Sequence, residues 1–574
     1  MVRTHMRLML MLFMLFLLLS ISTTIRRDVS ILFSRTSLII IFNCIIILTM
    51  NIDLTLLDKG IGLYGGLFSI TSLTQIFRFF VYIISYIILL LTSYFPRKYL
   101  EDNSLHIKTL EEKEIKRRNI DLSFIFNKMG EQFRIIEYSF IILLILIGNM
   151  LLLSTCDLVS LFLSIELQSY GLYLLCSLYK NSELSTYSGL TYFLLGGLAS
   201  CFILLGIGLL YANSANINLD SLYIITNLSN FTDNNINIID WYTPYYIYYS
   251  ILILSVGLLF KISAAPFHFW SPDVYDNIPT IVTTFVAIIP KLSILICLFE
   301  LVHYTGNILI GTGLTWTSGL LLSSLLSLII GTVLGLTQSR IKRLLAYSTI
   351  SHLGFILLSL SVNSIESNQA FIFYLMQYTI SNLNAFILLL SMGYALYFTL
   401  NNSIEYNKLQ DKNNSPIQLT NQIKGYSEIN PILALSFGIT LFSFVGVPPL
   451  IGFFAKQMVL SSALDKGYVF LVLVAILTSV IGAVYYLGII RKMYFDKHDY
   501  TIYTTSNNKY INYLYLINRN KNITKPLYIN NIILSNYLTL TISVITLIIL
   551  VFILVPQEFL NMSNILTLVL YVPN

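Results

Sequence analysis

The stretch GLLFKISAAPFHFW, residues 257–270, places a lysine and a proline inside an apolar run that is long enough to cross a membrane. Pro266 follows Lys261 by five residues. Proline removes a helical hydrogen bond and clashes with the preceding turn, so this predicted helix should break there. Backbone groups freed inside a bilayer must face protein or a water-filled cavity. The stretch therefore predicts a broken helix that holds a lysine away from lipid.

A second stretch, FSFVGVPPLIGFFAK at residues 442–456, repeats this arrangement with Pro448 and Pro449 ahead of Lys456. It should also break at its prolines. The two breaks lie five predicted spans apart, and repeats with an odd number of spans have opposite orientations in the membrane, as in many transporters. The pair of breaks favours two inverted five-helix repeats over two unrelated proline kinks.

The composition of the whole chain supports a membrane protein. Hydrophobic residues make up 56% of the 574 positions and charged residues only 11%. A soluble domain has about one quarter charged residues, so this chain could not cover a water-facing surface. A spanning helix needs about 20 mostly apolar residues, and about fourteen runs qualify. These runs predict an all-α, polytopic membrane protein, and they lie at 6–22, 32–50, 67–95, 133–154, 158–179, 187–211, 246–268, 279–303, 313–338, 344–361, 369–400, 431–463, 467–490 and 533–555.

Charge alternates between the loops. Loops after odd-numbered runs carry most lysines and arginines, whereas the loop at 212–245 has none. This is the positive-inside bias, and it predicts both termini on the basic-poor side, with Arg3 and Arg7 as exceptions. Lys342 and Arg343 are expected in a surface loop. The formal net charge of +6 is spread over these loops instead of forming one stripe, so no nucleic-acid partner is expected.

Four charged residues lie near the middle of predicted spans. Glu166 follows Asp157 by about 13 Å along a helix, which is close to mid-membrane. A carboxylate at that depth costs about 2.5 kcal/mol or more unless it is paired or hydrated. Lys261, Lys291 and Lys456 also lie within apolar runs. Charges inside a membrane mark functional sites by default.

These four residues can be interpreted as a proton path. A lysine in an apolar site holds its proton less tightly, and a nearby carboxylate reverses this effect. Glu166 beside Lys261 would form a switchable pair, and Lys291 and Lys456 could pass the proton along the midplane. The alternative for Glu166 and Lys261 is a static ion pair, and the alternative for the other two is snorkelling to an interface.

Histidines and cysteines add weaker signals. His268, His303 and His352 could assist a proton path because histidine titrates near neutral pH, but packing against neighbouring helices is the more common role. The cysteines form no C-x-x-C pair that could hold a metal or an iron–sulfur cluster, and they are Cys44, Cys156, Cys176, Cys201 and Cys297. No metal site and no bound cofactor are expected in this chain.

Four motifs give the sequence a family resemblance. They are SIELQSYGLYLL at 164–175, KISAAPFHFWSPDVYDNIP at 261–279, LTQSRIKRLLAYSTISHLGF at 336–355 and GVPPLIGFFAK at 446–456. In order and spacing the chain resembles the antiporter-like membrane subunits of respiratory NADH:ubiquinone oxidoreductase, or complex I. The resemblance implies fourteen helices with inverted repeats at spans four to eight and nine to thirteen.

The resemblance also implies residue roles and surroundings. It implies Glu166 and Lys261 as the interacting pair, Lys291 as the central relay and Lys456 as the outer lysine. It implies the mitochondrial inner membrane, with both termini on the intermembrane-space side. Flavin, iron–sulfur clusters and quinone would be bound by other subunits. The implied partners are membrane lipid, accessory subunits and other complex I membrane subunits, namely the antiporter-like chain 4 and the small chain 4L.

The predicted domains follow the repeats. Residues 1–130 would form a three-helix segment and a charged loop, 131–303 the first repeat, 304–496 the second repeat, and 497–574 a polar loop and one helix. Lys456 argues against chain 4 of the family, which has a glutamate there, and the tail lacks the long lateral helix of chain 5. Thr191 stands where the family commonly has a lysine.

Three functions remain open at this point. The leading hypothesis is a proton-translocating subunit of complex I. The second is an Mrp-type cation/proton antiporter that works without redox subunits. The third is a scaffold subunit whose charges only fix helix packing. Buried water that joins the charged row to a membrane surface would favour the first two over the third.

Overall fold

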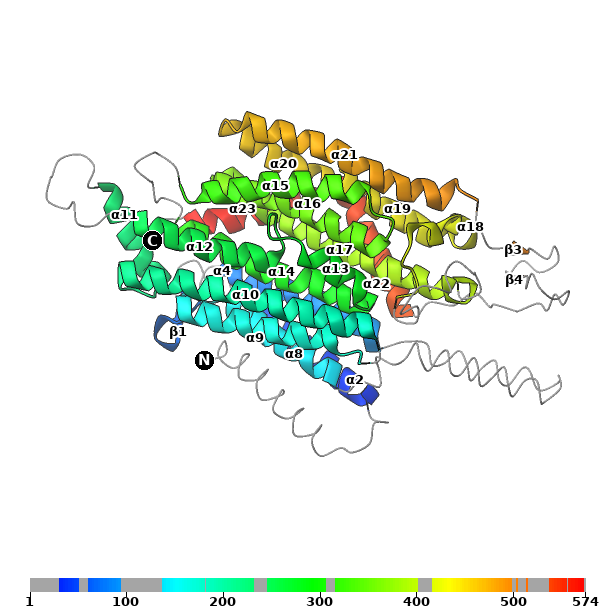
Figure 1. The fold of residues 1–574 in the computed structure, drawn as a ribbon, viewed down its shortest axis with the longest axis horizontal. Helices are drawn as coiled ribbons and strands as arrows, with labels where there is room; N and C mark the ends of the chain where they lie inside the picture. Colours follow the sequence, from blue (N-terminus) through cyan, green and yellow to red (C-terminus); the bar gives the residue numbers. More distant parts are fainter. Residues whose placement is uncertain are drawn as a thin grey trace.

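The computed structural model of the chain is a bundle of helices that run along one common direction (Figure 1). Nine helices in the described part are long and apolar enough to cross a membrane, and three shorter apolar helices accompany them. This confirms the predicted all-α, polytopic membrane protein. The total of fourteen spans stays a prediction, because the run at 6–22 lies outside the described residues. The structure describes residues 30–50, 60–93, 137–180, 182–231, 245–305, 315–400, 415–497, 502–503, 513–514, 536–554 and 556–571.

The N-terminal part contains two apolar helices and a hairpin. Helix α2 spans Ser30–Met50 and α4 spans Ser72–Ser93, with β1 (Ile61–Leu63), η2 (Tyr64–Gly66) and β2 (Phe68–Ile70) between them. The predicted span at 67–95 is therefore wrong at its start, because residues 68–70 pair with 61–63 as an antiparallel strand. The hairpin accepts a hydrogen bond from Cys156 N at Leu67 O, 3.0 Å long, which ties it to the bundle.

The next group of helices coincides with the first predicted repeat. Its long members begin with α9, which is capped by the Asp157 carboxylate accepting from Ser160 N. The short helix α11 was not predicted; it lies in the loop expected at 212–245. The bounds are α8 Glu137–Leu152, α9 Leu158–Ser177, α10 Glu183–Ser214, α11 Leu219–Phe231, α12 Tyr245–Ile262, α13 Trp270–Asn277 and α14 Thr280–Thr305.

A second group follows the same plan. Its members are α15 Thr317–Leu336, α16 Ile341–Val362, α17 Ile365–Leu400, η5 Thr420–Ile423, α18 Tyr426–Ile429, α19 Pro431–Val445, α20 Ile451–Asp465 and α21 Val469–Tyr494. Helix α16 is buried at every position except Arg343. Lys342 is 0% exposed, so the expectation that it lies in a surface loop is wrong. Helix α16 begins at Ile341, just before the lysine, and the lysine side chain points inward.

The two groups meet at α14, α16 and α17, and their outer helices face away from the core. Figure 1 shows α20 and α21 at one side of the bundle and α9 and α10 at the other. Helix α14 is buried along nearly its whole length, whereas α10 exposes Leu190, Leu194 and Leu198. An apolar exposed face is what a helix needs in lipid. The core therefore holds the polar residues that lipid could not accommodate.

The C-terminal part ends in two helices instead of one. Helix α22 spans Asn536–Val551 and is followed by η6 (Phe552–Leu554) and by α23 at Pro556–Tyr571, with a bend of 88° between α22 and α23. The predicted run at 533–555 covers α22 and η6, but the expectation of a single helix in this segment missed α23, which begins at Pro556, a position where proline is tolerated. Two short strands, β3 (Ile502–Tyr503) and β4 (Tyr513–Leu514), pair with each other before α22.

Candidate functional site: a buried row of ionisable residues

Glu166 and Lys261 form an ion pair across two helices. Lys261 Nζ lies 3.5 Å from Glu166 Oε1, and the two side chains are 4% and 14% exposed. The ammonium also donates to Tyr173 Oη over 3.2 Å. A single buried charge inside a membrane is costly, and its opposite charge together with a hydroxyl offsets part of that cost. The structure thus brings together the pair that the sequence predicted.

The break after α12 positions Lys261. The helix ends at Ile262, one residue after the lysine, and α13 begins only at Trp270. Ser263 has φ +68°, which turns the chain out of the helix. Trp270 Nε1 donates to Phe260 O over 2.9 Å and so binds a carbonyl next to the break. The break around Pro266 therefore holds the lysine on an interrupted helix with its backbone partly satisfied by a side chain.

Lys291 lies in the core of the bundle. It is 2% exposed, and its Nζ donates to Thr349 Oγ1 of α16 over 3.2 Å. The same Nζ lies 5.3 Å from the centre of the Tyr275 ring, a distance at which a cation is attracted to an aromatic face. In the contacts recorded for the described residues, Lys291 Nζ meets only neutral groups. Snorkelling to an interface is excluded for this side chain by its burial.

Four aromatic side chains bridge the space between Lys261 and Lys291. The Tyr173 and Tyr192 rings are 4.8 Å apart, and Tyr192 stacks on Trp270 at 4.6 Å. Trp270 meets Tyr275 edge to face at 6.3 Å. No direct contact between the two lysines is recorded in the described residues. The Glu166–Lys261 pair and Lys291 are therefore separate sites, and packed aromatic side chains fill the space between them.

Lys456 lies against the second break. Helix α19 ends at Val445 and α20 begins at Ile451, so Pro448 and Pro449 occupy the interruption. Lys456 Nζ donates to Phe444 O over 2.9 Å and to Val445 O over 2.8 Å. Carbonyls at the C-terminal end of a helix lack helical donors and attract cations. The lysine thus serves as the cap of the helix that the prolines interrupt.

Helix α16 connects Lys291 with Lys456. Thr349, His352 and Phe355 follow one another at spacings of three residues, so they share one face of the helix. Thr349 contacts Lys291, and the Phe355 ring lies 5.5 Å from Lys456 Nζ. His352 stands between them and interacts electrostatically with Lys456. This face carries the row from the first group of helices, at Lys291 on α14, to Lys456 on α20 in the second.

His352 is the one candidate histidine that the structure places in the row. Its Nδ1 lies 2.8 Å from Tyr374 Oη and its Nε2 lies 3.4 Å from Tyr486 Oη. His268 is half-buried in the first break and contacts Pro266 O at 3.3 Å. His303 lies twelve residues beyond Lys291, about 18 Å along α14, beside Tyr304. The latter two therefore stand apart from the row.

Thr191 Oγ1 donates to Ser188 O within its own helix, at the position before Tyr192 of the aromatic bridge.

Among the residues with described positions, no group of three or more histidine, cysteine or acidic side chains is placed to bind a metal ion. The expectation that the chain binds no metal and no cofactor stays a prediction.

Several partners of the row were not identified from the sequence. Tyr173, Tyr275 and Thr349 contact the lysines, yet the chain holds 39 tyrosines, and a hydroxyl in an apolar run is common. The only available signal was position: Tyr173 lies seven residues, or two helical turns, after Glu166 and so shares its face. That signal alone does not distinguish a partner from a packing residue.

Known proteins resemble this chain over much of its length. A family described as NADH:quinone oxidoreductase/Mrp antiporter, TM, matches residues 155–482. The chain is 40% identical to NADH-ubiquinone oxidoreductase chain 2 of Rhizopus oryzae, with 97% of this chain and 98% of that protein covered. It is 36% identical to NADH-quinone oxidoreductase subunit N of Pelagibacter ubique, over 63% of this chain and 70% of the relative.

Two solved structures share the fold. A chain of respiratory complex I from Thermus thermophilus superposes with a TM-score of 0.65 at 21% identity, covering 97% of this chain and 98% of that one. A chain of the Mrp complex from Dietzia superposes with a TM-score of 0.69 at 15% identity, covering 99% and 97%. The matched region contains all four residues of the row. The chain therefore belongs to the antiporter-like transmembrane family of NADH:quinone oxidoreductases and Mrp antiporters, with chain 2 and subunit N among its relatives.

Proposed function

We infer that this chain is a proton-translocating membrane subunit of mitochondrial complex I. NADH oxidation and ubiquinone reduction in other subunits would drive the protons through it. The observation that carries this inference is the Glu166–Lys261 ion pair beside an interrupted helix. Its two charged atoms, Lys261 Nζ and Glu166 Oε1, lie 3.5 Å apart. Together with Lys291 and Lys456, the pair forms a row that crosses the bundle from α9 to α20.

The chemistry of the row suits stepwise proton transfer. While Glu166 lies beside Lys261, the carboxylate favours the charged ammonium; when the two separate, the ammonium loses that support. A proton released there would pass to Lys291 and then, by way of the α16 face with His352, to Lys456. Movement of the pair would thus be converted into movement of a proton along the row.

The two inverted five-helix repeats and the total of fourteen spans belong to this proposal. They are supported by the matching order of the two groups, in which a broken helix is fourth in each: α12 and α13 in the first, α19 and α20 in the second. Repeats of this kind place an ion site at the interface between them. The row crosses that interface at Lys291 and Thr349.

The surroundings of the chain are part of the same proposal. We propose that it lies in the mitochondrial inner membrane, with both termini on the intermembrane-space side. Its neighbours would be chain 4, the small chain 4L, accessory subunits and lipid. Flavin, iron–sulfur clusters and quinone would act in other subunits, so no redox step would occur here. The names of the chain 2 relatives support the complex, and the apolar helices support the membrane.

Two other functions are separated by experiment. The likeness to an Mrp chain keeps a cation/proton antiporter in view, but at 15% identity it reflects the fold alone. A scaffold role would leave the ion pair as a packing device. The assembled complex should be placed in sealed vesicles, and NADH-driven proton uptake should be measured with and without added sodium or potassium.

Replacing either member of the pair is the first test. Glu166→Gln and Lys261→Met should each lower the rate of proton pumping by about tenfold or more, because each leaves the other charge without its partner. Arg491→Gln is the matched control, since this side chain is 78% exposed and its acidic neighbour lies 4.0 Å away. Unchanged pumping in fully assembled variant complex would show a scaffold, and pumping that requires sodium or potassium would show an antiporter.

A further inference from the structure

Lys291 must regain a proton after each transfer, and polar side chains lead from it toward the end of the bundle where Lys342 lies. We propose that Tyr378 and Asn382 of α17 form a proton-uptake branch that reaches Lys291 through Thr349. The proposal rests on the proposed function, because the branch supplies protons to the row described there.

A chain of hydrogen bonds begins at Lys291. Its Nζ contacts Thr349 Oγ1 at 3.2 Å; the Thr349 hydroxyl donates to Ala346 O over 2.8 Å and also interacts with the hydroxyl of Tyr378. Asn382 Nδ2 then donates to Tyr378 Oη over 3.4 Å, one helical turn farther along α17. Tyr378 and Asn382 are 2% and 1% exposed, so lipid and bulk water do not reach this series of hydrogen bonds directly. The contacts are continuous from α14 through α16 to α17.

Hydroxyl groups in series can pass a proton along while each keeps the same number of protons. A proton that arrives at Tyr378 Oη displaces the hydroxyl's own proton to Thr349 Oγ1. The Thr349 hydroxyl turns away from Ala346 O, to which it donates in the structure, and passes its proton to the lone pair of an uncharged Lys291, which becomes an ammonium. Each hydroxyl ends with the one proton it had at the start. Asn382 does not carry the proton; its Nδ2 donates to Tyr378 Oη and so orients the tyrosine hydroxyl.

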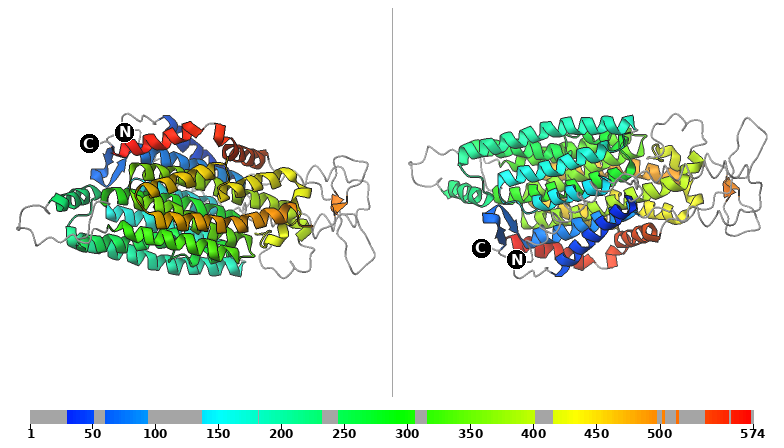
Figure 2. Two further views of the ribbon diagram at one scale, coloured as in Figure 1. Left: turned by 90° about the horizontal axis from the view of Figure 1, so that it is seen from above. Right: turned by 90° about the horizontal axis from the view of Figure 1, so that it is seen from below.

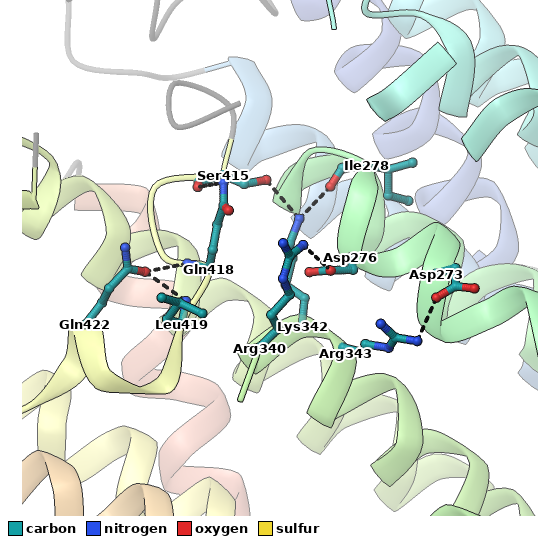
Figure 3. A network of polar contacts seen from close by, with 10 residues as sticks. All are labelled: Asp273, Asp276, Ile278, Arg340, Lys342, Arg343, Ser415, Gln418, Leu419 and Gln422. Atoms are coloured by element: carbon teal, nitrogen blue, oxygen red, sulfur yellow. Dashed lines mark hydrogen bonds and ion pairs between the residues drawn. The ribbon is translucent and has the colours of Figure 1, made fainter. Parts of the chain in front are cut away.

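The branch points to an end of the bundle that reaches the surface. Figure 3 shows Lys342 Nζ donating to Ile278 O over 2.7 Å and to Ser415 Oγ over 2.9 Å. In the same view Arg340 pairs with Asp276 at 2.6 Å, and Arg343 pairs with Asp273 at 2.9 Å. The Asp273 side chain is 62% exposed, whereas Lys342 is fully buried. The cluster thus extends from the surface into the protein.

The geometry of α16 and α17 places Asn382 between that cluster and Thr349. The two helices are antiparallel, because His352 contacts Tyr374 and Thr349 contacts Tyr378. Lys342 precedes Thr349 by seven residues, about 10 Å along α16. Asn382 lies one turn beyond Tyr378 in the same direction. The remaining interval is short enough for ordered water to complete the connection.

A buried hydroxyl beside the branch indicates where water would bind. The Tyr275 hydroxyl has no hydrogen-bond partner among the residues that the structure describes, and this residue is 0% exposed. Buried polar atoms are nearly always bonded to protein or to water. Tyr275 lies beside Lys291 and interacts with Tyr378, so a water bound to its hydroxyl would lie next to the branch.

The branch is tested in the assembled complex by removing its hydroxyl and its amide separately. Tyr378→Phe keeps the ring and deletes the oxygen, and Asn382→Leu keeps the volume and deletes the polar atoms. Each should slow NADH-driven proton pumping in sealed vesicles by about tenfold, the effect of losing one hydrogen bond along the route. Thr349→Val should do the same, whereas Thr349→Ser, which keeps a hydroxyl, should restore most of the rate.

Tyr426→Phe is the matched control. Tyr426 is also a fully buried tyrosine whose hydroxyl has no partner within the described residues, but it lies on α18, away from the row. Its variant should pump at the rate of the unchanged protein. Lys291→Met is measured in parallel, because it disables the row itself.

The outcomes separate the branch from the row. Slow pumping in Lys291→Met with normal pumping in both Tyr378→Phe and Asn382→Leu overturns the branch and leaves the proposed function standing. Normal pumping in Lys291→Met overturns the proposed function. Should Tyr378→Phe fail to assemble, Asn382→Leu decides alone. Equal loss in Thr349→Ser and Thr349→Val would show a packing role instead of proton transfer and would overturn the branch.

Discussion

At the scale of single residues, Lys456 depends on the backbone conformation of Gly446. The glycine ends α19 with φ +86° and lets the chain turn so that Phe444 O and Val445 O face the ammonium. A Cβ built at this glycine would lie 3.1 Å from Lys456 Cδ. Both the positive φ and the close approach favour glycine here. The charge is therefore positioned by a residue that carries no charge.

Gly446→Ala should destabilise the protein and displace Lys456. The left-handed conformation costs an L-residue about 1–2 kcal/mol, and the contact with the lysine adds to that cost. We expect a lower midpoint of thermal unfolding for the assembled complex and slower proton pumping. Gly488→Ala is the control, because a Cβ there meets nothing within 4 Å. A Gly446→Ala complex as stable and as active as this control would contradict the role of the glycine.

The charged members of the site could be predicted from the sequence, and their neutral partners could not. Glu166, Lys261, Lys291 and Lys456 are conspicuous because ionisable residues are rare in apolar runs. Thr349 and Tyr378 look like any other hydroxyl in a helix until the tertiary structure brings them to Lys291. Lys342 was misplaced because a lysine next to an arginine at the end of an apolar run resembles a loop. Its burial depends on Ile278 and Ser415, which are distant in sequence.

At the scale of helices, α16 is the element that the rest of the bundle surrounds. It contacts α15 along its length, and Gly331 of α15 allows the close approach: a Cβ there would lie 2.6 Å from Ser351 N. Small residues permit such close helix contacts in membranes. Because α16 carries Thr349 and His352, its placement sets the distance between the two halves of the row.

Gly331→Ala should push α15 away from α16. Overpacking of a tight contact typically costs about 1–3 kcal/mol. The assembled complex should unfold at a lower temperature, and proton pumping should slow because Thr349 shifts relative to Lys291. Gly319→Ala on the same helix is a fair comparison, since the nearest atom to its Cβ lies 4.0 Å away. Equal thermal stability of the two variants would be evidence against this close contact.

Element positions were largely predictable, and their exceptions have physical causes. Long apolar runs predicted most of the helices between α2 and α22, because a run of about 20 apolar residues crosses a bilayer as a helix. The hairpin β1–β2 and the helix α11 could not be predicted from the apolar runs. Contacts with other parts of the protein, outside those runs, hold them in place. One such contact is the bond from Leu158 N to Ile217 O just before α11. Helix α23 escaped because Pro556 ends one apolar run and starts another helix.

At the scale of the whole molecule, the row runs across the bundle, and the terminal helices lie to one side of it. Figure 2 shows α4 close to α23 on one edge, away from α10 and α21. Contacts between α4 and both C-terminal helices agree with this placement. Lys291 lies between Lys261 and Lys456, because its helix α14 contacts α12 on the one hand and α17, which packs against α20, on the other. A proton that moved along the row would travel from α12 to α20.

The most direct test of this account measures protons translocated per NADH oxidised by assembled complex that carries Glu166→Gln and Lys261→Met together. If the two residues act as one pair, the double variant should translocate no fewer protons than the worse single variant, because residues that act as a unit are not additive. The account predicts a ratio well below that of the unchanged protein in all three variants. A double variant with the ratio of the unchanged protein would contradict it.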